Sequence, residues 1–314
     1  MKRRIFPLLV LLLASLVFFT AQGAVKCLYK GKSLGKGHVV TVEYMGPLDT
    51  SCKKSFQGMD IWGKYMVSLQ HTGMATLYTF DGNTAEKKGQ FQLASYDSTA
   101  QGYNHANVAS FGCRPVRKSD VLPLLYVTRC NPTRWKGLDQ VLFVERIRPD
   151  RNTAELVQVI GYEDSTILSR HTTQWVVDCQ TGSLYGFGNT SANPNRHFVV
   201  KFRLPEYRGP ADCVVRLHEK DLLEKYFMED YGIESSFQPV IQGACVRDGL
   251  LYMPTGVGTE KRPSILYVWD LNKRKMRNAI DLQKAIPVEM EDCCFVGNYL
   301  MVQCQKCWYR LSFE

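Results

Sequence analysis

The chain has 314 residues, of which 45% are hydrophobic and 22% charged, and its formal net charge is +9 at pH 7. This length can bury one large hydrophobic core, and no linker or low-complexity tract divides it, which argues against several linked domains. The positive balance disfavours basic partners and permits acidic ones.

The first 23 residues have the pattern of a signal peptide. Three basic residues at 2–4 precede an apolar run at 5–19 that is too short to span a bilayer comfortably, and Ala21 and Gly23 suit a cleavage site. We expect a mature domain over 24–314, exported to the periplasm, the cell surface or the extracellular space. Loss of three basic residues lowers the charge from +9 to +6. A retained membrane anchor is the alternative for this segment, and no later stretch is apolar enough to cross a membrane.

A pattern of short apolar strands separated by turns recurs along the mature chain. Copies begin at Gln57, His105, Thr173 and Gln242, and a fifth copy begins at Met290 but stops after its third strand. The strand within residues 37–46, "GHVVTVEYMG", can pair with that last copy and hide its exposed edge. The sequence therefore predicts an all-β chain, a β-propeller with five four-stranded blades closed by the N-terminal strand. A six-bladed ring is the alternative, whereas a β-sandwich would not recur at this period.

Two local features qualify this pattern. Gly63 and the segment 247–249 are predicted hairpin turns between the first and second strands of their blades. The segment 218–233, "HEKDLLEKYFMEDYGI", places apolar residues at helical spacing, so we expect a helix between the third and fourth blades.

Eleven cysteines remain after cleavage, and export would permit disulfides. "EDCCF" and "CQKC" are read as parts of strands, where neighbours and residues three apart point to opposite faces. That geometry suits neither a zinc site nor a thioredoxin-type dithiol. We expect small core fillers with one or two bridges.

Polar side chains mark the start of the innermost strand in every copy. In a propeller these starts surround one end of a central channel, so converging amides, imidazoles and a carboxylate predict a binding site there. The alternative is that they hydrogen-bond neighbouring blades and hold the ring together. The residues are Gln57, His105, Asn107, His171, Gln174, Gln242 and Glu291.

The loops between second and third strands open on the same face and carry excess positive charge. Arg134 beside Trp135 would suit a carboxylated or sulfated sugar, and Arg196 and Arg262 add further cations. His71 also lies in such a loop. We expect an anionic small molecule or oligosaccharide at the channel mouth, with no metal, no cofactor and no nucleic acid, and a monomeric protein.

Catalysis is left open by the sequence. A glycoside hydrolase would need two carboxylates, for which Asp60, Glu291 and Asp292 are candidates without a clear pair. A polysaccharide lyase could use His105 or His171 with Tyr103 and Arg170. An envelope protein-interaction scaffold is a third possibility.

The phrases "QGMDIWGKYMVSLQHTG", "NHANVASFG" and "LPLLYVT" resemble an uncharacterised group of secreted β-propeller proteins from bacteria of the gut and oral type. The resemblance spans most of the mature chain. It implies the same fold and export, and a role in handling glycans or peptides, but carries over no catalytic residue.

Overall fold

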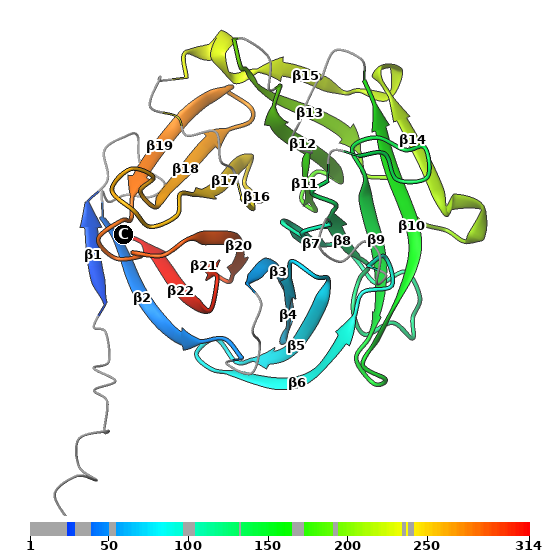
Figure 1. The fold of residues 1–314 in the computed structure, drawn as a ribbon, viewed down its shortest axis with the longest axis horizontal. Helices are drawn as coiled ribbons and strands as arrows, with labels where there is room; N and C mark the ends of the chain where they lie inside the picture. The colour runs from blue at the N-terminus through cyan, green and yellow to red at the C-terminus, as the bar shows by residue number, and fades with distance from the viewer. Residues whose placement is uncertain are drawn as a thin grey trace, which may run out of the picture.

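In the computed structural model the strands form five sheets arranged around one axis, and the innermost strands of these sheets follow one another in chain order (Figure 1). The structure describes residues 24–28, 39–49, 55–96, 104–131, 133–164, 173–190, 194–233, 237 and 242–314. We number the blades one to five by their innermost strands: β3 (Phe56–Trp62), β7 (Ala109–Phe111), β11 (Gln174–Asp178), β16 (Cys245–Arg247) and β20 (Met290–Val296). The predicted five-bladed propeller is confirmed.

Blades one, three and four each have four antiparallel strands, placed outward in chain order. Blade one adds β4 (Tyr65–Gln70), β5 (Met74–Phe80) and β6 (Ala85–Gln92). Blade three adds β12 (Ser183–Asn189), β13 (His197–Arg203) and β15 (Glu224–Phe227). Blade four adds β17 (Leu250–Thr255), β18 (Ile265–Asp270) and β19 (Lys275–Asp281).

Blades two and five have a fifth strand at the outer edge. Blade two contains β8 (Leu125–Thr128), β9 (Leu142–Arg148) and β10 (Thr153–Glu163), followed by β14 (Val214–His218) parallel to β10. β14 lies between β13 and β15 in the chain, so the chain returns to blade two before it completes blade three. Blade five contains β21 (Tyr299–Cys304), β22 (Cys307–Phe313), β2 (Val39–Pro47) and β1 (Val25–Leu28).

The N-terminal strand closes the ring, as the sequence predicts. β2 pairs antiparallel with β22, with Val40 opposite Phe313 and Tyr44 opposite Tyr309. Val40 is fully buried in the cluster between blades four and five. The N-terminal strand β2 and the C-terminal strand β22 therefore share one sheet, which removes the exposed edge that an incomplete fifth blade would leave.

The predicted hairpin turns are also present. Gly63 has φ 58° in the turn between β3 and β4, and Gly249 has φ 71° between β16 and β17. Positive φ is the backbone conformation that two-residue hairpins require and that glycine adopts without strain.

The helix expected over 218–233 is wrong. Residues 224–227 form β15, which pairs with β13, and short 3-10 turns cover Glu219–Asp221 and Met228–Tyr231. Tyr226 packs in the cluster between blades three and four, whereas Phe227 packs against the cluster between blades two and three. Because a blade is covered on both faces, adjacent apolar residues in one strand both pack against core clusters, and the pattern resembles a helix.

Apolar clusters fill the five junctions between neighbouring blades, and they form the core of the ring. In chain order of the junctions, their representatives are Phe143 (one–two), Trp175 (two–three), Trp269 (three–four), Leu266 (four–five) and Trp308 (five–one). No helix in the described ranges is long and apolar enough to cross a membrane.

Candidate functional site

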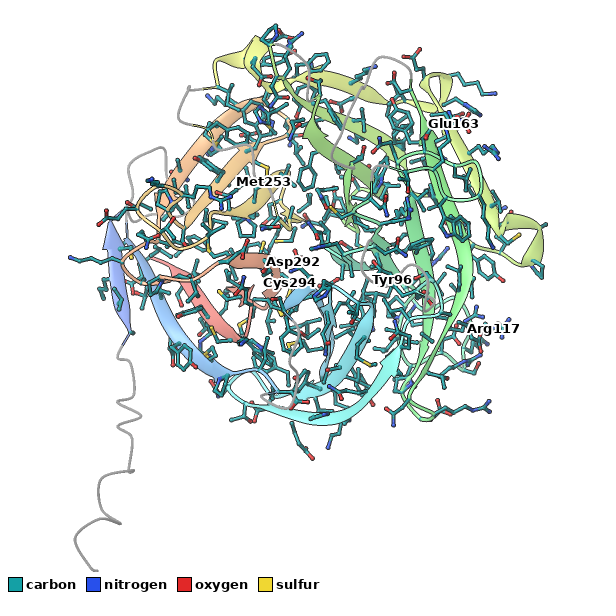
Figure 2. The ribbon with its side chains drawn as sticks, in the orientation of Figure 1. Tyr96, Arg117, Glu163, Met253, Asp292 and Cys294 are labelled. Atoms are coloured by element: carbon teal, nitrogen blue, oxygen red, sulfur yellow. A yellow bond between two sulfur atoms is a disulfide. The ribbon has the colours of Figure 1, made fainter. Side chains whose placement is uncertain are left out.

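The starts of the five innermost strands meet at one end of the axis, which we call the channel mouth. The β4–β5, β17–β18 and β21–β22 loops return to the same end, because the innermost strand of each blade leads away from it and the second strand leads back. In Figure 2 Asp292, on β20, lies beside the centre of the ring, whereas Glu163 and Arg117 lie at its periphery.

Two blades contribute imidazoles to the channel mouth. His105, just before β7, has its Nδ1 3.5 Å from Oε1 of Gln57 on β3. The ring of His71, in the β4–β5 loop, has its centroid 5.7 Å from that of His105. Desolvation lowers the pKa of His105, so this imidazole is neutral near pH 7 and can both donate and accept a hydrogen bond.

Carboxyl and amide groups continue this network across blades five and four. The Gln57 side chain hydrogen-bonds Glu291, which is only 2% exposed. Burial first, and then the negative charges of Glu289 and Asp292, raise the pKa of Glu291 to about 9. Glu289 accepts a hydrogen bond from Gln242 Nε2 at 2.8 Å. A carboxyl group held protonated at neutral pH can donate a hydrogen bond as well as accept one.

Glu289 also accepts a hydrogen bond from the side-chain amide of Gln305, in the β21–β22 loop. Neither residue was predicted from the sequence to belong to the site. Their signal was weak but present, because Glu289 is close in the chain to Glu291 and Gln305 belongs to a loop on the predicted face.

Three polar atoms at the channel mouth are buried and have no hydrogen-bond partner: Oδ1 of Asn107, Oε1 of Gln174 and Oε2 of Glu291. They come from blades two, three and five. Gln174 uses its amide nitrogen instead, 3.7 Å from the sulfur of Cys130. Buried polar groups in native proteins are almost always hydrogen-bonded to protein, water or ligand, so each of these acceptors needs a donor that water or a ligand can supply.

The backbone at the channel mouth is strained. His105 has φ 58° and Ala106 has φ 44°, the left-handed region that residues other than glycine rarely adopt. The amide of Ala106 donates to the Tyr96 hydroxyl at 2.7 Å, and its carbonyl accepts from the amide of Gly58 at 2.8 Å. A Cβ on Gly58 would lie 2.6 Å from that carbonyl oxygen. Strain held in place by such surroundings concentrates at functional sites.

Three of the predicted loop residues do not join this network. Arg134 donates from Nε and Nη2 to the carboxylate of Asp139 at 2.9–3.1 Å. The Trp135 ring packs edge-on against Phe143, with centroids 5.4 Å apart.

Arg196 likewise pairs with Asp230 and stacks on Phe227, 3.9 Å from its ring centroid. These two cations and the aromatic ring that were predicted to bind a sugar therefore already contact other protein groups. Arg262 is exposed in the β17–β18 loop, and no ion pair joins its side chain to another described residue. His171, like Tyr103 and Arg170, lies outside the described residues.

Two of the candidate hydrolase carboxylates have structural partners. Asp292 accepts the amides of Met59 at 2.8 Å and Ala109 at 3.1 Å, and thereby ties blade five to blades one and two. Asp60 accepts the amide of Phe111 in blade two. Both carboxyl groups therefore join neighbouring blades through backbone amides.

The strand-based interpretation of "CQKC" was wrong. Gln303 is opposite Trp308 in the register of β21 and β22, so Cys304 and Cys307 face each other across the two-residue turn 305–306. Their thiols hydrogen-bond, and this contact lowers the pKa of Cys307. Within the described ranges no group of three or more His, Cys, Asp or Glu side chains could hold a metal ion.

A cavity of about 310 Å³ lies at the opposite end of the axis and was not predicted. All five innermost strands line it, because each strand ends there. Its lining includes Asp60, Ser110, Val177, Arg247, Cys245 and Cys293.

Comparisons with known proteins assign neither a family nor a function to this chain. No protein-family model matches the chain, and no curated protein matches its sequence. Among solved structures, the crystal structure of the computationally designed Ika8 protein is similar over 86% of this chain and 99% of that one, with 8% identity and a TM-score of 0.36. The strand topology itself defines the class: the protein is a five-bladed β-propeller.

Proposed function

We propose that this protein is an exported binding propeller that takes an anionic, hydroxyl-rich ligand, a glycan bearing carboxylates or sulfates, at the channel mouth. The observation that carries the proposal is the set of three partnerless buried oxygens on Asn107, Gln174 and Glu291. Oxygen acceptors from three blades suit the hydroxyl groups of a sugar, each of which can donate one hydrogen bond.

The charge of the ligand is inferred from the groups around these oxygens. Glu291 is protonated at neutral pH, so it does not repel an anion and can donate to it. Lys261, Arg262 and Lys306 are exposed on the loops of blades four and five at the same face. They supply the positive field that the sequence analysis had attributed partly to Arg134 and Arg196.

Export is supported by two features. The first 23 residues have the basic, apolar and small-residue pattern of a signal peptide. Cys113 and Cys179 form a disulfide, and disulfides persist in oxidising compartments outside the cytosol.

The proposal is tested by titrating the mature protein with neutral, uronic and sulfated oligosaccharides in a calorimeter. We expect binding of the acidic sugars, weakened about five- to tenfold by Arg262→Ala, in proportion to the loss of one charge contact. Arg134→Ala is the matched control, because its guanidinium already pairs with Asp139, and it should leave the affinity within about twofold. Indifference to every sugar class would contradict the proposal.

A glycoside hydrolase at the same mouth is the second candidate function. It is favoured by one observation, a protonated Glu291 in the electrostatic field of Glu289, since retaining and inverting glycosidases use one carboxylic acid and one carboxylate. Products of the titrated sugars are therefore analysed for new reducing ends. Cleavage that disappears in Glu291→Gln while binding persists would establish a glycoside hydrolase. If all sugars stay intact, binding is the only function supported.

A further inference from the structure

Two thiols from neighbouring blades are in contact beside the axis. The sulfur of Cys245, on β16 of blade four, lies 3.5 Å from the sulfur of Cys293, on β20 of blade five. Both residues line the axial cavity at the end opposite the channel mouth. Cys293 is 1% exposed and Cys245 is partly exposed.

At the other junctions, bonds between side chains or between a side chain and the backbone join the innermost strands of neighbouring blades. Blades two and three are joined by the disulfide between Cys113, just after β7, and Cys179, just after β11. Blades three and four are joined by Gln180 and Asp248, whose side-chain bond measures 2.8 Å. Asp60 and Asp292 join blade one to blades two and five. At the junction of blades four and five, the thiol pair occupies the corresponding place.

We propose that Cys245 and Cys293 are the site of a second inter-blade disulfide, which covalently joins blade four to blade five. A disulfide bond is about 2.05 Å long, so the two sulfurs must approach by roughly 1.5 Å, which side-chain rotation about χ1 can provide. The two strands that carry these cysteines are the innermost strands of adjacent blades.

The oxidant is a disulfide of the class of oxidised glutathione or a disulfide-bonded oxidoreductase. The Cys245 thiolate, the more exposed of the two, attacks one sulfur of that disulfide, and one thiol leaves. The Cys293 sulfur then attacks the mixed disulfide at Cys245, and the second thiol leaves. The protein loses two electrons to the oxidant, and the two thiol protons end on the two released thiols.

Burial sets the rate of this exchange. It raises the pKa of Cys245 and of Cys293, so few molecules hold the attacking thiolate at neutral pH in the folded ring. Exchange should therefore be faster at alkaline pH or while the blades assemble, and the bond should resist reduction once formed.

The experiment maps disulfides in the mature protein refolded with oxidised and reduced glutathione. Free thiols are alkylated in denaturant, the protein is digested without reduction, and peptides are identified by mass spectrometry. We expect a peptide joining Cys245 to Cys293 beside the one joining Cys113 to Cys179, with Cys294 alkylated. Alkylation of both Cys245 and Cys293 after oxidation, with the Cys113–Cys179 bridge formed, would overturn the proposal.

Melting temperatures give a second readout. The double variant Cys245→Ser/Cys293→Ser should melt about 5–15 °C below the oxidised wild type. Cys294→Ser is the matched control, because it removes a neighbouring buried thiol and should keep the cross-linked peptide. If the double variant does not fold, the peptide map of the wild type decides alone. None of these measurements requires a ligand, so they are independent of the proposed glycan binding.

Discussion

Glu291 shows at the scale of one residue how the fold creates a reactive group. A bulge in β20 separates Met290 from Asp292 in the pairing with β21, and Glu291 occupies it. The bulge places the side chain in the buried network with Gln57, where its charge is unfavourable. The sequence identified Glu291 as a polar strand start, but its protonation depends on burial and on Glu289, which only the assembled ring supplies.

The raised pKa of Glu291 makes stability depend on pH in a definite direction. In the unfolded chain this carboxyl loses its proton near its ordinary pKa of 4.5, whereas the folded protein holds it to about 9. Between these values the folded state binds the extra proton, so stability falls as pH rises. The Glu291→Gln side chain cannot ionise, so this variant should lose less stability as pH rises. Its melting temperature should exceed that of the wild type by roughly 3–10 °C at pH 9 and by much less at pH 5.

Differential scanning calorimetry from pH 5 to pH 9 measures this effect. Glu86→Gln serves as the control, because the Glu86 side chain is 74% exposed, and it should follow the wild type across the range. A constant difference between Glu291→Gln and the wild type at all pH values would show that the carboxyl is ionised throughout.

Strand β2 is the element on which closure of the ring depends. It contributes Val40 and Val42 to the cluster between blades four and five, although nearly 270 residues separate it from its partner β22. This pairing could be predicted, because the fifth repeat lacks a strand and the N-terminal segment supplies one. β15 could not be predicted, since burial on both faces hides the two-residue alternation by which a strand is recognised.

Shortening one buried side chain in β2 tests this role. Val40→Ala should lower the free energy of unfolding by about 1–3 kcal/mol, because it leaves a gap in a closed core. Urea denaturation provides the measurement, and Val116→Ala, at a position 41% exposed, should change it by less than about 0.5 kcal/mol. Equal effects for the two variants would mean that the N-terminal strand does not complete blade five.

In the whole molecule, five blades form a ring, and each blade packs against its two neighbours. Each junction has its own apolar cluster, and the innermost strands are joined across it by hydrogen bonds, a disulfide or a thiol contact. Repetition of one strand pattern was sufficient to predict this ring and the convergence of Gln57, His105 and Glu291. The loop cations were less predictable, because their ion pairs with Asp139 and Asp230 depend on which neighbours each loop meets after folding.

We propose the channel mouth as the ligand site, and the imidazoles at the mouth would report directly on binding there. In protein labelled with nitrogen-15 histidine, titration with a uronic oligosaccharide should shift the ring resonances of His71 and His105, which lie together at the mouth. The resonances of His197, beside Glu229 in blade three, and of His218, at the edge of blade two, should not move. Binding that shifts His197 or His218 while His71 and His105 stay unchanged would contradict a ligand site at the channel mouth.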